Sequence, residues 1–149
     1  MRNFRGDFDK LIQDVFTALG RRIRAGKDYE IVDRGVPHTP PKELPPGKMA
    51  ICTFSYDGRF LKIGKVGSKS SALFISQHYN SKWARKVFAD KLIDDEGMEQ
   101  RKTKCKDWIK ENCRRIDILV DAEIGDFTLE LVEAVLRYHC KPKYDAKSQ

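Results

Sequence analysis

The chain has 149 residues, 40% of them hydrophobic and 10% aromatic, which suits one domain with a packed core and excludes wholesale disorder. No apolar run approaches the roughly 18 residues of a membrane span, and the first residues lack the apolar segment of a secretory signal. We therefore expect a soluble, cytoplasmic protein that does not bind membranes. Lysine and arginine outnumber aspartate and glutamate by 29 to 22, and the net charge of +7 favours a polyanionic partner such as nucleic acid.

The four cysteines form no Cys-x-x-Cys pair, and in a cytoplasmic protein we expect reduced thiols rather than two disulfides. A zinc site is an alternative that matches no established ligand spacing. Its ligands would be Cys105, Cys113, His139 and Cys140.

Helical spacing of apolar residues predicts an amphipathic helix from Phe8 to Ile23 that ends at Gly26. The single apolar stripe of this helix is most simply explained by core packing. Five of the six prolines then fall between Pro37 and Pro46, which predicts an extended connector along the domain surface. A protein-binding adaptor that uses this helix or the proline segment is a further hypothesis.

Met49–Tyr56 and Arg59–Lys65 read as a β-hairpin around an Asp-Gly turn. A two-residue loop would place Cys52 opposite Ile63, whereas a three-residue loop with a bulge at Gly58 would place Cys52 opposite Lys62. We favour the second register, because it gathers Ile51, Leu61 and Ile63 on one face. Ala50, Cys52, Phe54, Phe60, Lys62 and Gly64 would then share the other face.

Helices are expected over 72–79, 83–93 and 104–112, followed by a strand with alternating Ile116, Ile118 and Val120. A last helix over 127–139 is expected to begin after Asp126 as its N-cap and to end before Pro142. The predicted fold is therefore α+β: a three-stranded antiparallel sheet in a β-β-α-β-α core flanked by helices. Residues 1–47 supply the N-terminal helix and the connector, both packed on a domain of residues 48–149.

This order of elements, together with several short motifs, resembles the GIY-YIG nuclease family over residues 48–145. The triplet Ala50-Ile51-Cys52 stands where GIY would, and Lys62-Ile63-Gly64 stands where YIG would, so that Cys52 and Lys62 replace both tyrosines. The family's helix arginine would fall at Leu73, with His78 about one turn further on. The sequence KPKYD after the last helix resembles the family ending KPxYN, with Asp145 in place of asparagine.

The resemblance implies that Glu133, on the last helix, binds Mg²⁺ or Mn²⁺ and that the chain hydrolyses phosphodiester bonds. Independently, Glu133 lies in an apolar stripe with Leu129, Leu136 and Cys140, where a carboxylate requires a partner. The partner is either a metal ion or Arg137, four residues along the helix.

The remaining candidate catalytic residues are Lys62, Lys65 and His78. Lys62 either contacts phosphate or acts as a base if Lys65 beside it lowers the Lys62 pKa. His78 is a second candidate base, and the alternative is a surface or capping role. Basic residues expected to contact nucleic acid, DNA in the first instance, are Lys62, Lys65, Lys69, Lys82, Arg85 and Lys86.

The resemblance leads to two functional hypotheses. The first is a metal-dependent endonuclease or a degenerate derivative of one. The second is a catalytically silent module that binds nucleic acid on the same scaffold.

Overall fold

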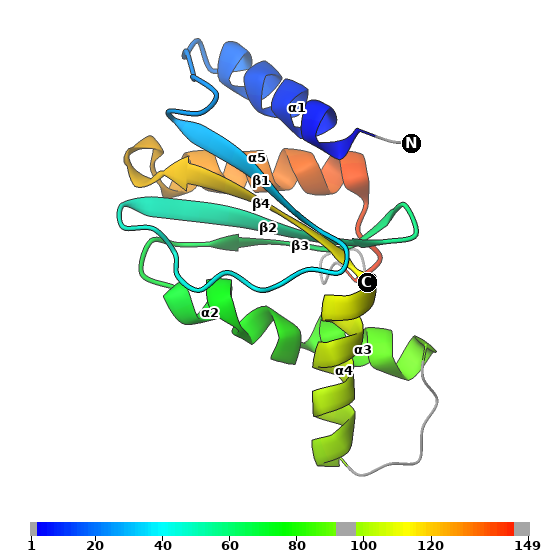
Figure 1. The fold of residues 1–149 in the computed structure, drawn as a ribbon. Coiled ribbons are helices and arrows are strands. Elements are labelled where there is room, and N and C mark those ends of the chain that lie inside the picture. Colours follow the sequence, from blue (N-terminus) through cyan, green and yellow to red (C-terminus); the bar gives the residue numbers. More distant parts are fainter. Residues whose placement is uncertain (1–2, 92–97, 145–149) are drawn as a thin grey trace.

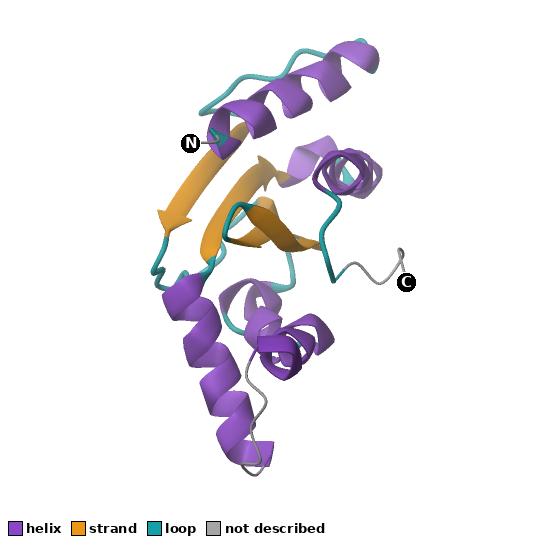
Figure 2. Ribbon diagram, turned by 90° about the vertical axis from the view of Figure 1, so that its right-hand side faces the viewer, coloured by secondary structure: helices purple, strands orange, loops and turns teal. Residues whose placement is uncertain are grey.

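The computed structural model describes residues 3–91 and 98–144 as an α+β fold with a four-stranded antiparallel sheet of order β1-β4-β2-β3. Helices cover both faces of this sheet: α1 and α5 form one layer, and α2, α3 and α4 form the other (Figures 1 and 2). The elements are α1 (Phe4–Ala18), β1 (Tyr29–Gly35), β2 (Lys48–Tyr56), β3 (Arg59–Val66), α2 (Ser71–Ile75), η1 (Gln77–Asn80), α3 (Lys82–Lys91), α4 (Met98–Asn112), β4 (Arg114–Asp121), η2 (Ala122–Ile124) and α5 (Asp126–Cys140).

The expected count of three strands was wrong, because β1 adds a fourth strand beside β4. Tyr29 pairs with Val120 and Ile31 with Ile118. Only Tyr29 and Ile31 in this short edge strand are buried, so its alternating pattern is too brief to stand out between the basic turn and the prolines. β1 therefore makes residues 1–47 part of the sheet as well as a covering layer.

Helix α1 begins and ends earlier than expected. The Asn3 side chain accepts a hydrogen bond from the Gly6 N–H and caps its start. Its end at Ala18 is followed by Gly20 in the left-handed region (φ 68°), a conformation that glycine adopts at no steric cost. Ile23 is buried all the same, because the loop after the helix folds back onto the core.

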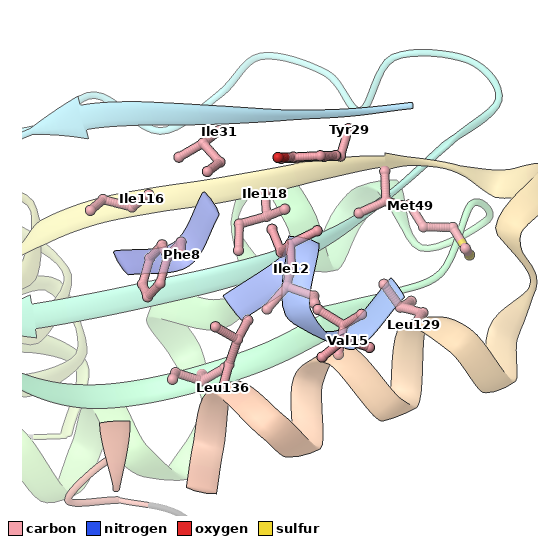
Figure 3. Close-up of a cluster of buried hydrophobic side chains, with 14 of the residues drawn as sticks. Phe8, Ile12, Val15, Tyr29, Ile31, Met49, Ile116, Ile118, Leu129 and Leu136 are labelled. Atoms are coloured by element: carbon pink, nitrogen blue, oxygen red, sulfur yellow. The ribbon is translucent and has the colours of Figure 1, made fainter. Parts of the chain in front are cut away.

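The first hydrophobic core lies between the sheet and helices α1 and α5 (Figure 3). Phe8, Ile12 and Val15 of α1 meet Ile118 of β4 and Leu136 of α5 there. The apolar stripe of α1 is thus used in packing within the chain, as the spacing predicted.

The hairpin has neither of the two expected registers. Tyr56 pairs with Arg59 across a two-residue loop, and the register then shifts so that Phe54 pairs with Lys62 and Cys52 with Gly64. Leu61 is the extra residue of this β-bulge, which turns Leu61 to the second core and leaves Phe60 in the first. The sequence interpretation had these two residues interchanged, whereas it placed Lys62 and Gly64 correctly beside Cys52 and Phe54.

The second core lies between the other face of the sheet and the layer of α2, η1, α3 and α4. The helix expected over 72–79 is divided into α2 and η1, α4 begins six residues before the expected start at Lys104, and the expected end at Ile93 lies outside the described residues. Gly125, not Asp126, is the N-cap of α5. No helix in the described ranges combines the length and the apolar character needed to cross a bilayer.

The segment after α5 passes from the first layer to the second around the edge strand β3. Lys141 ends the helix in the left-handed conformation (φ 47°). The Lys143 and Tyr144 N–H groups then donate to the Phe60 and Leu61 carbonyls at 3.0 and 2.9 Å, and Tyr144 is buried in the second core. The Lys-Pro-x-Tyr motif therefore fastens the chain across β3, whereas Asp145 lies outside the described residues.

Candidate nucleic-acid interface

Lys62, Gly64 and His78 come together on the second face of the sheet, and we call this group the β3 site. A side chain added at Gly64 would lie 3.5 Å from His78 Cε1 and 3.8 Å from Lys62 Cε. Because Gly64 has no side chain, its half-buried strand backbone lies directly between the Lys62 side chain and the His78 imidazole ring. A phosphate group can approach a glycine backbone closely for the same reason.

His78 is a buried, neutral imidazole with a polar atom that lacks a partner. The residue is only 4% exposed, and its Nε2 has no hydrogen-bond partner within the described part of the chain. Burial, reinforced by the positive charges of Arg115 and Lys62, lowers the pKa of His78 to about 4. An unpaired buried ring nitrogen costs free energy, which a ligand that hydrogen-bonds to it would recover.

Behind the β3 site lies a fully buried ion pair that sequence reasoning did not identify. The Arg115 Nε donates to Asp117 Oδ1 at 2.9 Å, and neither residue is exposed. Arg34 of β1 also donates from Nε to Asp117 Oδ2, at 2.5 Å. The Arg115 guanidinium also donates from Nη2 to the Phe74 carbonyl at 2.7 Å and from Nη1 to the Tyr79 hydroxyl at 3.1 Å. These additional hydrogen bonds stabilise the ion pair in its low-dielectric surroundings.

The network continues through Tyr79 to His38 of the proline connector. The His38 Nδ1 lies 2.7 Å from the Cys113 carbonyl, which only accepts, so Nδ1 carries the proton. The Tyr79 hydroxyl therefore donates to His38 Nε2, at 2.7 Å. Burial lowers the pKa of His38, against the opposing effect of the Cys113 carbonyl. This chain of bonds fixes η1, and with it the adjacent His78.

Cys52 and Leu73 occupy the positions where the resemblance placed a tyrosine and an arginine. Cys52 is fully buried, and its Sγ lies 3.5 Å from Arg115 Nη2. Burial raises the pKa of the Cys52 thiol well above its usual value. Leu73 is half-buried against the second core. Neither residue offers an acid, a base or a cation to a substrate.

Lys65 and Glu133 lie on the opposite face of the sheet from Lys62. Lys65 forms an ion pair with Glu130 of α5. Glu133 is 7% exposed and accepts a hydrogen bond from Arg137 Nη1 at 2.6 Å. Lys65 therefore does not lie beside Lys62. The hypothesis that Lys62 acts as a base required the two lysines to be neighbours. Lys62 and Glu133, the two residues that the endonuclease hypothesis brings to one phosphate, are therefore separated by the edge strand β3.

The other expected contact residues are exposed on the second layer or next to it. Lys69 lies in the loop before α2, and Lys82, Arg85 and Lys86 line α3 around the buried pair Trp83 and Ala84. Within the described residues no group of three or more His, Cys, Asp or Glu side chains is placed to hold a metal ion. A Mg²⁺ ion at Glu133 would have one protein carboxylate, shared with Arg137, and would take its other ligands from water and phosphate.

Searches with protein-family models, among curated proteins and among solved structures each found no match to this chain.

A signal for the missed network was present in the sequence of β4. In Arg114–Asp121 the charged residues Arg115 and Asp117 alternate with Ile116 and Ile118. With one face of this strand apolar, the other face must hold the two charges, and a strand covered on both sides can bury them only as a pair.

Proposed function

We propose that this chain is a nucleic-acid-binding domain with a GIY-YIG-like arrangement, which holds a backbone phosphate at the β3 site. The observation that supports this most directly is the Gly64 backbone, which lies between Lys62 and the His78 ring, whose Nε2 has no partner among the described residues. Lys62 forms no ion pair with another described residue and lies half-buried beside the ring. The β3 site thus combines a cation, a neutral ring nitrogen that can form a hydrogen bond, and a strand backbone without a side chain. This combination suits the oxygens of a phosphate group.

Nearby cations would extend the contact along the strand of nucleic acid. Lys69 precedes α2, and the exposed basic residues of α3 lie in the same layer as His78. Phosphate contacts of this kind position the backbone without reading sequence. We therefore propose binding with little sequence preference, DNA being the first substrate to test.

Metal-dependent cleavage is the second candidate function. It is favoured by Glu133, a buried carboxylate on the helix packed against β3, and by the Lys-Pro-x-Tyr segment that closes over the same strand. Mg²⁺ or Mn²⁺ on this carboxylate would polarise the scissile phosphate. Because Lys62 and Glu133 flank β3 from opposite faces, a phosphate contacted by both would lie across the sheet edge.

Substituting glutamine for Lys62 is expected to weaken DNA binding equally for unrelated sequences. Removing one phosphate contact should also reduce the slope of log affinity against log salt by about 1. Fluorescence anisotropy with labelled duplexes over a range of salt concentrations measures both quantities. The matched control is Lys10→Gln, an exposed lysine of α1 across the sheet that pairs with Asp14 at 3.3 Å. An equal effect of the two substitutions, or binding that is insensitive to salt, would refute the proposed site.

Changing Glu133 to glutamine separates the two candidate functions. If the chain is a nuclease, supercoiled or branched DNA incubated with Mg²⁺ or Mn²⁺ will be nicked by the wild type, and we expect this activity to be abolished in the variant while DNA binding persists. Glutamine keeps the size of the side chain and can still accept a bond from Arg137. Binding without nicking by either protein identifies the silent module; nicking that persists in the variant excludes Glu133 as the metal ligand.

A further inference from the structure

The outward face of α5 carries an apolar stripe that no part of the described chain covers. Phe127 is 88% exposed, Tyr138 75% and Leu131 40%, and these are three of the five large hydrophobic residues exposed among the described residues. Together with the exposed Ala134 they recur at intervals of four, three and four residues. At 100° per residue the four side chains lie within an arc of about 60°, and we call them the α5 stripe.

The α5 stripe is directly opposite the face by which α5 packs on the sheet. Leu129, Val132 and Leu136 are buried in the first core. α5 lies on the outside of its layer, beside α1, so that its free side points away from the body of the protein (Figure 2). Core packing therefore accounts for one side of α5 and leaves the stripe without a packing partner among the described residues.

We infer that the α5 stripe is a homodimer interface in which two α5 helices pair antiparallel about a twofold axis. The spacing of the stripe is the alternating four and three of a coiled-coil seam. Turned end for end, the stripe is complementary to itself. Phe127 faces the partner's Tyr138, and the larger Leu131 faces the partner's smaller Ala134, as an isologous contact requires.

The charges that flank the stripe favour the antiparallel over the parallel arrangement. A twofold axis perpendicular to the helices brings the same flank of both copies together, so Glu130 and the partner's Arg137 lie on facing flanks, offset along the helix by two residues or about 3 Å, and the contact occurs twice. Within one chain Glu130 pairs with Lys65 and Arg137 with Glu133, so the interchain contacts would join two existing ion pairs into one network. In a parallel pair these two residues would not meet.

The area available is adequate for a stable association. Aromatic side chains bury roughly 150–250 Å² each, so two copies of Phe127 and Tyr138 would supply up to about 600–1,000 Å², to which Leu131, Ala134 and the flanks add. Specific interfaces bury about 1,000 Å² or more. The inference is independent of the proposed function, since it uses none of the residues of the β3 site.

Sedimentation equilibrium on the full chain at increasing concentration tests the pairing. We expect a monomer–dimer equilibrium, which Leu131→Glu at the centre of the stripe weakens by roughly 30-fold or more. The matched control, Val36→Glu, alters an exposed residue (47%) outside α5 and should leave the equilibrium unchanged. A wild type that stays monomeric, with its stripe instead engaging anionic lipid vesicles or nothing at all, overturns the inference, as does a dimer unaffected by Leu131→Glu.

Disulfide trapping tests the orientation. Leu131→Cys mixed with Ala134→Cys should yield a mixed disulfide on mild oxidation, in excess over disulfides within either variant alone. Cys52, Cys105 and Cys113 are buried, and the unmodified chain oxidised in parallel accounts for the partly exposed Cys140. Disulfides that form preferentially between two Leu131→Cys chains would indicate parallel helices and contradict the antiparallel pairing.

Discussion

Replacement of Arg115 by methionine is expected to lower the free energy of unfolding by about 3–5 kcal/mol, the usual cost of breaking a fully buried ion pair by removing one partner. The substitution removes the fully buried one of the two arginine partners of the Asp117 carboxylate, leaving only Arg34, and it also removes the donors to the Phe74 carbonyl and the Tyr79 hydroxyl. It also removes a cation that lies 5.2 Å from the ring centres of Phe54 and Phe74. Urea unfolding followed by circular dichroism measures the change.

Arg114→Met in the same strand is the matched control for this experiment. Arg114 pairs with Asp33 at 3.7 Å, and both side chains are about one-third exposed, so its loss should cost under about 1 kcal/mol. Asp117→Asn added to Arg115→Met should restore part of the loss, because the buried carboxylate that Arg34 alone would hold is then removed. An effect of Arg115→Met within the roughly 0.5 kcal/mol typical of surface changes would mean that the pair is not buried.

Stability is expected to fall as the pH is lowered from about 6.5 to 4, and His78 should account for much of the change. The ordinary pKa of 6.5 applies to the unfolded chain, whereas burial and the neighbouring cations lower the pKa of His78 to about 4 in the fold. Between these values the unfolded chain binds a proton that the folded chain does not, so acid favours unfolding. The difference corresponds to about 3 kcal/mol, present above pH 6.5 and lost by about pH 4.

Urea midpoints recorded across this pH range for the wild type and for His78→Gln isolate the contribution of His78. His38, whose pKa burial also lowers, remains in both proteins and maintains a shallower slope of the same sign. Identical pH profiles for the two proteins would show that His78 is not buried in its neutral form. The neutral state of His78 also matters for ligand binding at the β3 site, because a neutral imidazole ring can accept a hydrogen bond as well as donate one.

The parts of the fold that the sequence predicted are those with strong local signals. The stripe of α1, the Asp-Gly hairpin and the alternation in β4 each specify an element by its own residues. β1 was not predicted, because two buried residues are too few to show an alternating pattern. The predicted hairpin register was wrong, because the bulge at Leu61 depends on which of the two cores each neighbouring side chain joins. Bulges are decided by tertiary packing, which no local pattern contains.

The candidate site was predictable in its parts and not in its assembly. Lys62 and His78 were identified from the hairpin and the following helix, and the structure brings both of them beside Gly64. Glu133 was identified as a buried carboxylate, but its separation from Lys62 depends on which face of the sheet α5 covers. That choice is made by the crossover of the chain between layers, a property of topology rather than of spacing.

The stretch before β2 is anchored in both layers of the molecule. Its helix and Tyr29 enter the first core, while His38 and Leu44 are held in the second layer, against Cys113 and Tyr79 and among the apolar side chains there. Neither helical layer can separate from the sheet without breaking the contacts of this segment. The two layers should therefore unfold together in one cooperative transition. A shortened chain that starts at the hairpin would lack this segment, including β1. β4 would then be an unpaired edge strand, free to pair with strands of other chains.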